Sequence, residues 1–407
     1  MPDSGKPKFF YGYVVVAAGF LVSVLLVGAF ASFGVFFKPL SLELGWTRAV
    51  TSSAMSVANL VMGISCIFAG RLTDKYGPRV VLLACGLFLG LGHLLMSQVS
   101  SLWQLYLFYG VMVGVGMSGS EIPIATTVAR WFVKRRGIVI GITKAGAGIG
   151  FALVPLLANS LIISDGWRSA YTTIGIISLV GIVAFSLLYK RDPSRTGQLP
   201  YGVTEVETAE SNIDIRGFSL REAMGTRQFW MFSAVWFIFV FCMQIILVHI
   251  VPHATDLGIS ATIAATILSM IGGFSILGRL GMGGLSDRLG TKSVFVITAC
   301  FLGSSLLWVQ FAQEVWMFYL FAAIYGIAHG GYFALLPLMV ARLFGLLSLG
   351  TILGAVLFIG AIGGTIGPVI AGRVFDVTGS YQPVLIAILA LSIISIILML
   401  LLRPIKK

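Results

Sequence analysis

Two basic side chains, Lys144 and Arg279, stand inside long apolar stretches of the sequence. If those stretches cross a membrane, burying such a charge costs roughly 3 kcal/mol, and a residue of this kind usually marks the path of a substrate or an ion. A guanidinium can bind a carboxylate through two parallel hydrogen bonds. We therefore expect Arg279 to bind a small organic anion.

Lys144 is expected to have a partner in Glu121. Glu121 stands nine residues before Arg130, and Lys144 stands eight residues after Arg136. At a helical rise of ~1.5 Å per residue, both side chains lie about 12–13 Å from the short basic loop between their helices. This spacing predicts a buried ion pair inside the N-terminal part of the fold, with either a structural or a coupling role.

The sequence has four histidines, whose side chains can titrate near neutral pH. His249 is our first candidate for a proton carrier, and Asp256 and His329 are the alternatives. His253 follows His249 by one helical turn. We expect His93 to be a packing residue, because its segment should lie at the periphery of the fold.

A small hydroxy acid also needs an apolar wall and one or two hydroxyl contacts. Aromatic, hydroxyl and small side chains in the stretches around Arg279 and Lys144 can provide them. The candidate lining residues are Tyr332, Phe333, Phe358, Ser275, Ala145 and Gly28. The four cysteines lie in apolar stretches without metal-ligand spacing, and we expect no metal, no disulfide and no cofactor.

Membrane-spanning helices are needed to position these residues. Of the 407 residues, 58% are hydrophobic and only 10% are charged, with a mean hydropathy of +0.99. This composition excludes a soluble enzyme and a disordered chain. No segment alternates as the strands of a membrane barrel do, so stretches of ~20 apolar residues are expected to be helices. The twelve expected spans are at about 11–37, 47–70, 79–98, 102–129, 137–160, 168–189, 228–252, 260–283, 292–311, 315–341, 346–371 and 382–402.

The basic residues set the expected orientation. Of the 27 Lys and Arg, four (Lys38, Arg48, Arg168 and Arg373) fall in the loops on one side and two inside spans, which leaves 21 on the side of both termini. Positive charge favours the cytoplasmic side, so we expect both termini there and a location in the plasma (inner) membrane. The net charge of +12 reflects these short clusters and does not point to nucleic acid as a partner.

A polar linker and an internal repeat divide the chain. The expected domains are residues 1–189, a linker at 190–227, and residues 228–407, with six spans in each half. The segment 70–79 matches 283–292, and Val128-Ala-Arg130 matches Val340-Ala-Arg342 at an offset that differs by only one position. Two loops matching at nearly one offset indicate parallel six-helix repeats, an architecture typical of transporters.

The repeated loop, Gly-x-x-x-Asp-(Arg/Lys)-x-Gly-x-(Arg/Lys), resembles the signature of the major facilitator superfamily. The resemblance covers the whole chain and implies an all-α fold of twelve membrane helices in two pseudo-symmetric halves. Asp74, Arg79, Asp287 and Arg288 would then belong to gating loops. Each carboxylate can either cap a helix N-terminus or pair with an arginine across the cytoplasmic face. A pairing of this kind across the cytoplasmic face would stabilise the state that is open to the outside.

A second pattern narrows the family. Residues 131–146 resemble the helix 5 signature of monocarboxylate transporters, and residues 11–16 resemble the helix 1 signature without its acidic residue. The opening residues and the loop 165–168 also resemble bacterial oxalate/formate antiporters. The resemblance implies that Arg279 binds the substrate carboxylate. The acidic residue that the family usually has four positions earlier is replaced by Ser275.

These observations predict a transporter of small monocarboxylates, such as lactate or pyruvate, working by proton symport and alternating access. The alternative is an oxalate/formate-type anion exchanger. The resemblance to those antiporters implies a second cation, a lysine in the eleventh helix, but the expected helix at 346–371 lacks a lysine. One free cation favours a single carboxylate. We expect no enzyme: the chain contains neither His-Glu-x-x-His nor Gly-x-Ser-x-Gly. The partners are then the anion, a proton and the lipid bilayer, and a monomer should suffice.

Overall fold

The structure, a computed structural model, describes residues 9–46, 48–203 and 217–403, which are almost entirely helical. The elements are α1 (Gly12–Ala31), α2 (Phe33–Leu44), α3 (Arg48–Tyr76), α4 (Pro78–Met96), α5 (Leu102–Leu105), η1 (Tyr106–Val113), α6 (Gly114–Met117), η2 (Ser118–Ser120), α7 (Ile122–Trp131), α8 (Arg136–Leu187), η3 (Pro193–Thr196), α10 (Leu220–Met224), α11 (Arg227–Asp256), α12 (Ala261–Leu289), α13 (Thr291–Val309), α14 (Val315–Phe344), α15 (Leu349–Thr378) and α16 (Gln382–Leu401).

The described part of the chain contains 11 helical segments that are long and apolar enough to cross a membrane. One of them, α8, has 52 residues and bends at Gly166, whose φ of 79° and ψ of 163° are not helical. Glycine adopts a positive φ readily, so α8 supplies one span on each side of the bend. The described residues therefore hold the twelve spans predicted. The loop expected over 161–167 is reduced to this single bend.

The outer surface of the bundle is apolar as well as its interior. Along α16, for example, Ile386, Ile393, Ile397 and Leu400 are exposed. Spacings of three, four and seven residues place these side chains on one face of the helix. A continuous exposed apolar face of this kind is covered by lipid in a membrane protein. The chain is therefore a multi-pass membrane protein.

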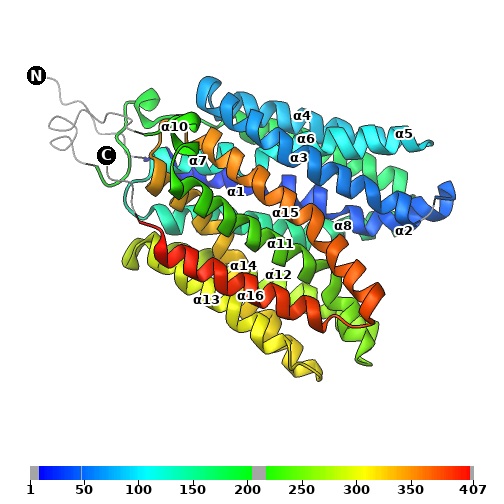
Figure 1. Cartoon of the computed structure of the whole chain (residues 1–407). Coiled ribbons are helices and arrows are strands. Elements are labelled where there is room, and N and C mark those ends of the chain that lie inside the picture. Colours follow the sequence, from blue (N-terminus) through cyan, green and yellow to red (C-terminus); the bar gives the residue numbers. More distant parts are fainter. Residues whose placement is uncertain (1–8, 47, 204–216, 404–407) are drawn as a thin grey trace, which may run out of the picture.

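Both ends of the described chain lie at one end of the bundle, called here the terminal end (Figure 1). From there the helices of the two halves diverge: α2 and α5 run to one side of the opposite end, and α13 and α16 run to the other. The most extensive contacts between the halves run along two helix pairs, α8 with α12 and α3 with α15. These two pairs form the boundary at which a site between the halves has to be sought.

Glycines allow the closest approach between the halves, near the terminal end. A Cβ on Gly137 would lie 2.1 Å from the carbonyl oxygen of Gly283, and one on Gly70 would lie 2.2 Å from that of Gly350. Positions 70 and 283 are equivalent in the repeat, and positions 137 and 350 are separated by the same distance along the chain. The repeat seen in the sequence therefore extends to the packing of the two halves against each other.

The described ends of the linker pack on the terminal end of both halves. Tyr201 forms a parallel β-bridge with Phe132, after α7, and Gly217 forms an antiparallel bridge with Gly345, after α14. Ser219 caps the short helix α10 by accepting a hydrogen bond from the backbone N–H of Glu222. Each end of the linker is thus fastened to the equivalent loop of a different half.

Candidate functional site

Arg279 lies at the centre of the contact between α12 and α8. Only 8% of the residue is exposed, and its carbonyl oxygen would be 2.4 Å from a Cβ on Gly141. The Nη1 group donates to the backbone carbonyl of Lys144 at 2.8 Å, whereas Nε is buried without a hydrogen-bond partner among the described residues. The guanidinium therefore keeps a free donor at the boundary between the halves.

Lys144, one residue of α8, has its side chain directed toward Glu121. The ammonium group forms an ion pair with the Glu121 carboxylate and also donates to the carbonyl of Ser120 at 3.2 Å. The side chain of Lys144 is 2% exposed and that of Glu121 is 18% exposed. The two residues thus meet at one depth, as their distances along the chain from the basic loop require.

A break in the fourth span positions Glu121. The π-helix η1, α6 and the 3₁₀ turn η2 precede it, and α7 begins directly after it. Pro123 lies at the start of α7 and has no N–H to give to the carbonyl four residues earlier. Lys144 satisfies the neighbouring carbonyl of Ser120. The apolar pattern did not predict this break, although the sequence Ser118-Gly-Ser-Glu-Ile-Pro123 was a usable signal.

His329 and Phe333 of α14 lie beside Arg279. The Nδ1 atom of His329 is 3.1 Å from the hydroxyl oxygen of Ser275, and the His329 and Phe333 ring centroids are 5.1 Å apart. The Arg279 guanidinium lies 5.7 Å from the Phe333 centroid. Ser275 stands one turn before Arg279 on the same face of α12. These four side chains form a mixed polar and aromatic surface next to the free donor.

Tyr332, another candidate lining residue, packs inside the C-terminal half. Its ring is fully buried and stacks on Phe239 at a centroid distance of 4.0 Å, with Phe295 at 5.0 Å on edge. These contacts give Tyr332 a packing role in this conformation.

The remaining lining candidates lie on three different helices, two of which belong to the interface between the halves. Ala145 is buried directly after Lys144 on α8. Phe358 of α15 approaches α3, with its ring 3.8 Å from the position that a Cβ on Gly63 would occupy. Gly28 of α1 packs inside the N-terminal half, where a Cβ would lie 2.3 Å from Val154. Ala145 is therefore the one of these three closest in sequence to the charged cluster.

His249 and Asp256 lie toward the opposite end of the bundle from the termini. The ring nitrogens of His249 contact the Tyr381 hydroxyl at 3.1 Å and the Pro368 carbonyl at 3.0 Å. Asp256 is the exposed last residue of α11. Burial, and then the nearby charges of Asp256 and Asp376, raise the pKa of Tyr381. His93, by contrast, is buried and bonded through both ring nitrogens to backbone carbonyls, as a packing residue would be.

The gating-loop carboxylates each cap a helix of the other half. Asp287 accepts hydrogen bonds from the backbone N–H groups of Gly137 at 2.7 Å and Ile138 at 2.9 Å. Asp74 accepts from those of Gly350 at 3.1 Å and Thr351 at 2.8 Å. A negative charge at a helix N-terminus is favourable. The sequence allowed either a helix cap or a pairing with an arginine, and the structure contains the helix cap.

Neither arginine of the two gating loops takes part in these caps. Arg79 and Arg288 are exposed, and the ion pairs of the described residues include neither of them. The caps consist of the two carboxylates, the backbone N–H groups and, at Asp74, the Thr351 hydroxyl.

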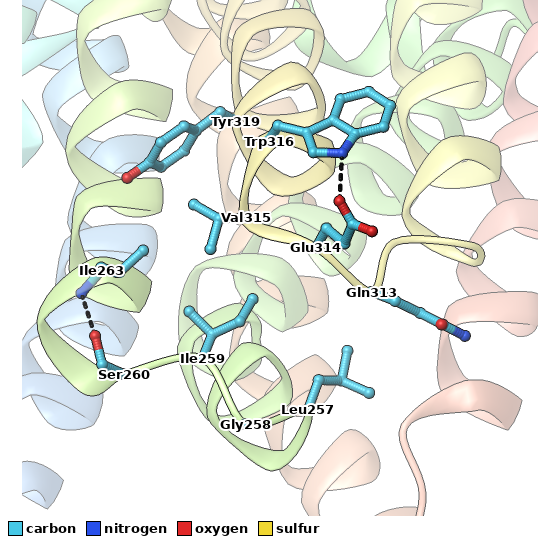
Figure 2. A pocket seen from close by; sticks show the side chains of 10 residues that line it. All are labelled: Leu257, Gly258, Ile259, Ser260, Ile263, Gln313, Glu314, Val315, Trp316 and Tyr319. Atoms are coloured by element: carbon cyan, nitrogen blue, oxygen red, sulfur yellow. Dashed lines mark hydrogen bonds between the residues drawn. The ribbon is translucent and has the colours of Figure 1, made fainter.

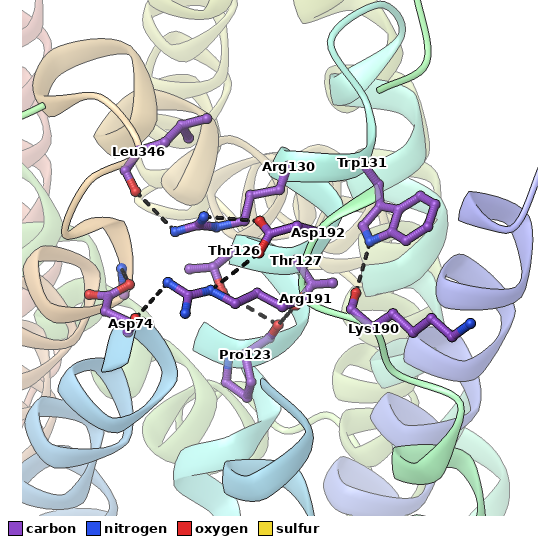
Figure 3. A network of polar contacts seen from close by, with 11 residues as sticks. Asp74, Pro123, Thr126, Thr127, Arg130, Trp131, Lys190, Arg191, Asp192 and Leu346 are labelled. Atoms are coloured by element: carbon purple, nitrogen blue, oxygen red, sulfur yellow. Dashed lines mark hydrogen bonds and ion pairs between the residues drawn. The ribbon is translucent and has the colours of Figure 1, made fainter. Parts of the chain in front are cut away.

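Arg130 joins the linker to the second half at the terminal end (Figure 3). It pairs with Asp192 at 3.1 Å and donates to the carbonyl of Leu346 at 3.4 Å. Arg191 donates to the carbonyl of Asp74 at 2.6 Å. This network and the two Asp caps hold the terminal end of the interface closed. Sequence reasoning missed the roles of Asp192 and Leu346, because no motif marks them.

A cavity of about 650 Å³ opens in the C-terminal half at the end opposite the termini (Figure 2). Its lining is mostly apolar, and its one carboxylate, Glu314, accepts a hydrogen bond from the Trp316 indole at 2.8 Å. Its lining contains no Lys, Arg or His. It lacks a cation for a carboxylate, so the cluster around Arg279 is the better candidate for an anion site.

Among the described residues no group of three or more His, Cys, Asp or Glu could hold a metal ion. The cluster of Arg279, Lys144 and Glu121 instead carries one net positive charge when all three are ionised. Such a cluster can bind one small anion.

Comparison with known proteins gives consistent matches over most of the chain. The family model of the Major Facilitator Superfamily matches residues 19–291 and 250–407. Monocarboxylate transporter 13 of Rattus norvegicus is 30% identical over 386 residues, covering 93% of this chain and 85% of that protein. Monocarboxylate transporter 12 of Rattus norvegicus is 26% identical over 405 residues, covering 93% and 82%. The crystal structure of the transporter FucP in the outward conformation superposes with a TM-score of 0.72 at 15% identity, covering 96% of this chain and all of that one.

Proposed function

The chain belongs to the major facilitator superfamily and, within it, to the monocarboxylate transporter family, and from this premise we propose that it carries small monocarboxylates, such as lactate or pyruvate, together with a proton. It is a membrane transporter and not an enzyme. In this proposal the two halves rock about a central site, which opens to each side of the membrane in turn.

One observation carries the proposal: Arg279 is a buried cation at the boundary between the halves with a donor left free. Its Nη1 is bonded to a backbone carbonyl, and its Nε has no partner among the described residues. An unpaired buried donor is costly, so an anion that accepts from it would bind favourably. A carboxylate fits the planar fork of a guanidinium, and Phe333 offers an apolar surface for the rest of a small acid.

The charges near Arg279 favour a monoanion over a dianion. Lys144 is paired with Glu121, so among the described residues of this cluster Arg279 is the cation without a carboxylate partner. An oxalate-type exchanger needs two available cations for its dianion. That alternative would hold only if Lys144 left Glu121 to bind substrate.

We assign the terminal end to the cytoplasm and the protein to the plasma membrane. Arg130, Arg191 and the other basic clusters lie at this end, in keeping with the preference of positive charge for the cytoplasmic side. With that assignment, the Asp caps close the cytoplasmic side and the conformation is outward-facing.

Proton coupling is supported by the position of His249. It lies toward the outer end, and a protonated ring could donate to both of its partners, the Tyr381 hydroxyl and the Pro368 carbonyl. In this proposal His249 receives the proton first, from the outer side, with Asp256 and His329 as the next candidates, and the proton then moves inward to the anion site. Transport of an anion with a proton is electroneutral, so the membrane potential would not oppose it.

Reconstitution in liposomes tests the proposal. Purified protein should accumulate labelled lactate or pyruvate when the lumen is alkaline relative to the medium, and much less without a pH gradient. Formate and oxalate complete the substrate panel. Absence of monocarboxylate uptake, or uptake of oxalate alone and only by exchange, would overturn the proposal.

A further inference from the structure

We propose that Glu121 is the group whose protonation sets the anion affinity of Arg279, and that Lys144 transmits the effect. This inference deepens the proposed function and rests on it. The sequence offers the Glu121–Lys144 pair with two open roles, structural or coupling. The geometry around the pair favours the coupling role for three reasons.

The first reason is the direct connection between the pair and the anion site. Lys144 bonds Glu121 with its side chain and receives the Arg279 Nη1 hydrogen bond on its own backbone carbonyl. Glu121, Lys144 and Arg279 are therefore linked through a single residue, without intervening side chains. A change in the Lys144 side chain acts next to the atom that holds the guanidinium in place.

The second reason is the irregular helix at Glu121. The 3₁₀ turn Ser118–Ser120 ends at this residue, whose φ and ψ are −109° and −58°. The equivalent helix of the other half, α14, runs without interruption from Val315 to Phe344. Broken helices at mid-membrane depth are tolerated where they line a site or a cavity. A purely structural ion pair would not require this interruption in only one half.

The third reason is that the Glu121 carboxylate is accessible to a proton and isolated from other titratable carboxylates. The Glu121 side chain keeps 18% of its surface accessible, whereas Lys144 keeps 2%, so a proton can reach the carboxylate while the ammonium stays enclosed. Isolation is also needed, because a neighbouring titratable group would share the proton.

Few other ionisable groups face the pair. Cys66 on α3 and Arg279 on α12 interact with it electrostatically. Cys85 on α4 is 3.7 Å from the Ser118 hydroxyl, and His329 on α14 is bonded to Ser275. On α1 and α15 the ionisable side chains stand near the helix ends. Glu121 is thus the carboxylate of this cluster within the described chain.

Coupling follows from charge. An ionised Glu121 neutralises Lys144 and repels an incoming carboxylate, whereas a protonated Glu121 removes the repulsion and leaves the Lys144 charge uncompensated. Anion and proton therefore favour each other's binding, and the effect is reciprocal. For one proton per anion, the apparent affinity falls about tenfold per pH unit above the pKa of the coupled group.

The test compares Glu121→Gln with a matched control, Glu43→Gln, in proteoliposomes. Glu43 also pairs with an arginine, Arg168, but in an exposed position. Glu121→Gln should lose lactate accumulation driven by a pH gradient while still exchanging lactate for lactate at a measurable rate. Its apparent KM for lactate should change less than about twofold over two pH units, whereas wild type and Glu43→Gln should show the steep dependence.

A second variant covers the case in which Glu121→Gln does not fold. The double variant with Glu121→Gln and Lys144→Met removes both charges and should show the same loss of pH dependence. Wild-type accumulation in Glu121→Gln or in the double variant overturns the inference. A pH profile that is flat in His249→Gln but steep in the Glu121 variants overturns it as well. A wild-type protein that transports no monocarboxylate overturns the proposed function itself, which is a distinct result.

Discussion

At the terminal end, the contact between α3 and α15 resembles the contact between α12 and α8. Asp74 caps one helix and Asp287 caps the other, and a pair of glycines brings the backbones together at each contact. Further into the membrane the two contacts still share their backbone geometry. The carbonyl of Cys66 would lie 2.4 Å from a Cβ on Gly354, and that of Arg279 would lie 2.4 Å from a Cβ on Gly141.

The side chains at these equivalent positions differ completely. Cys66 and Arg279 stand at the same place in the two copies of the repeat, four positions before Gly70 and Gly283 respectively, yet one is a buried thiol and the other a buried guanidinium. The internal repeat thus preserves the backbone contacts that close the terminal end. The charge that can bind an anion was added to only one of the two contacts, which makes a single asymmetric site in a nearly symmetric scaffold.

Replacing the side chains at these two positions, one at a time, should give the largest difference in uptake. Arg279→Gln should lower lactate uptake by roughly 100-fold, because loss of a buried charge-assisted partner costs about 3 kcal/mol. Cys66→Ala, the matched change at the other contact, should stay within about twofold of wild type. Initial uptake rates in proteoliposomes measure both. Uptake by Arg279→Gln at a third of the wild-type rate or more would refute the asymmetry.

The next largest effect is expected from disrupting the glycine backbone contacts that the two helix pairs share. Gly137→Ala places a Cβ 2.1 Å from the Gly283 carbonyl oxygen, so the helices must separate at a cost of roughly 1–3 kcal/mol. Gly70→Ala should behave alike at the other contact. Gly281→Ala, which adds a Cβ with no atom within 4 Å, is the control. We expect lower thermal stability and slower uptake in the first two variants. Equal behaviour of all three would contradict close packing at these glycines.

The helix caps should give a smaller and local effect. Removing a cap costs about 1 kcal/mol, or about fivefold in local opening. Asp287→Ala should therefore speed amide exchange at residues 137–138, and Asp74→Ala at 350–351. The second effect should be somewhat larger, because Asp74 also accepts from the Thr351 hydroxyl at 2.7 Å. Hydrogen exchange with mass spectrometry resolves the two helices, and the exposed Arg79→Gln should change neither. Acceleration at both helices from one variant would show that the caps are not independent.

The exposed Glu43–Arg168 ion pair, at the end opposite the termini, should have the smallest effect on stability. It provides a reference for the buried Glu121–Lys144 pair. The Trp167 indole and the Arg168 guanidinium lower the pKa of Glu43 below its ordinary 4.5. A lowered folded-state pKa adds stability above the unfolded-state value, and this stability is lost as the pH falls through the folded-state pKa. The Tm difference between wild type and Glu43→Gln should therefore be small and constant near neutral pH and shrink below about pH 4.5. A difference that grows on acidification would contradict this sign.

Much of the fold could be predicted from the sequence, because hydrophobic length and repeats are local signals. The twelve spans, the two halves and the position of Asp74 and Asp287 at facing helix ends follow from them. The bend at Gly166 could not be placed, since a glycine next to charged residues fits a loop as well as a single non-helical residue. The equivalence of Gly137 and Gly350 was present in the offset of the repeat and was missed.

The candidate site was less predictable, because its contacts depend on how two distant helices align. Counting residues from a common loop brought Glu121 and Lys144 to one depth. No such count relates Arg279 to the Lys144 carbonyl, since the alignment of α12 with α8 is set by packing between the halves. For the same reason, depth along one helix did not reveal that His329 contacts the Arg279 surface while Tyr332 packs elsewhere.

The Glu121–Lys144 pair also has a consequence for how the chain enters the bilayer during synthesis. Either helix alone would bring an uncompensated charge into the lipid, at roughly 3 kcal/mol on insertion scales. The two residues are 23 positions apart, joined by the short turn between α7 and α8. Insertion of the two segments as one hairpin lets the charges neutralise each other before they leave the translocon. The fourth and fifth spans should therefore integrate together, whereas their neighbours can integrate one at a time.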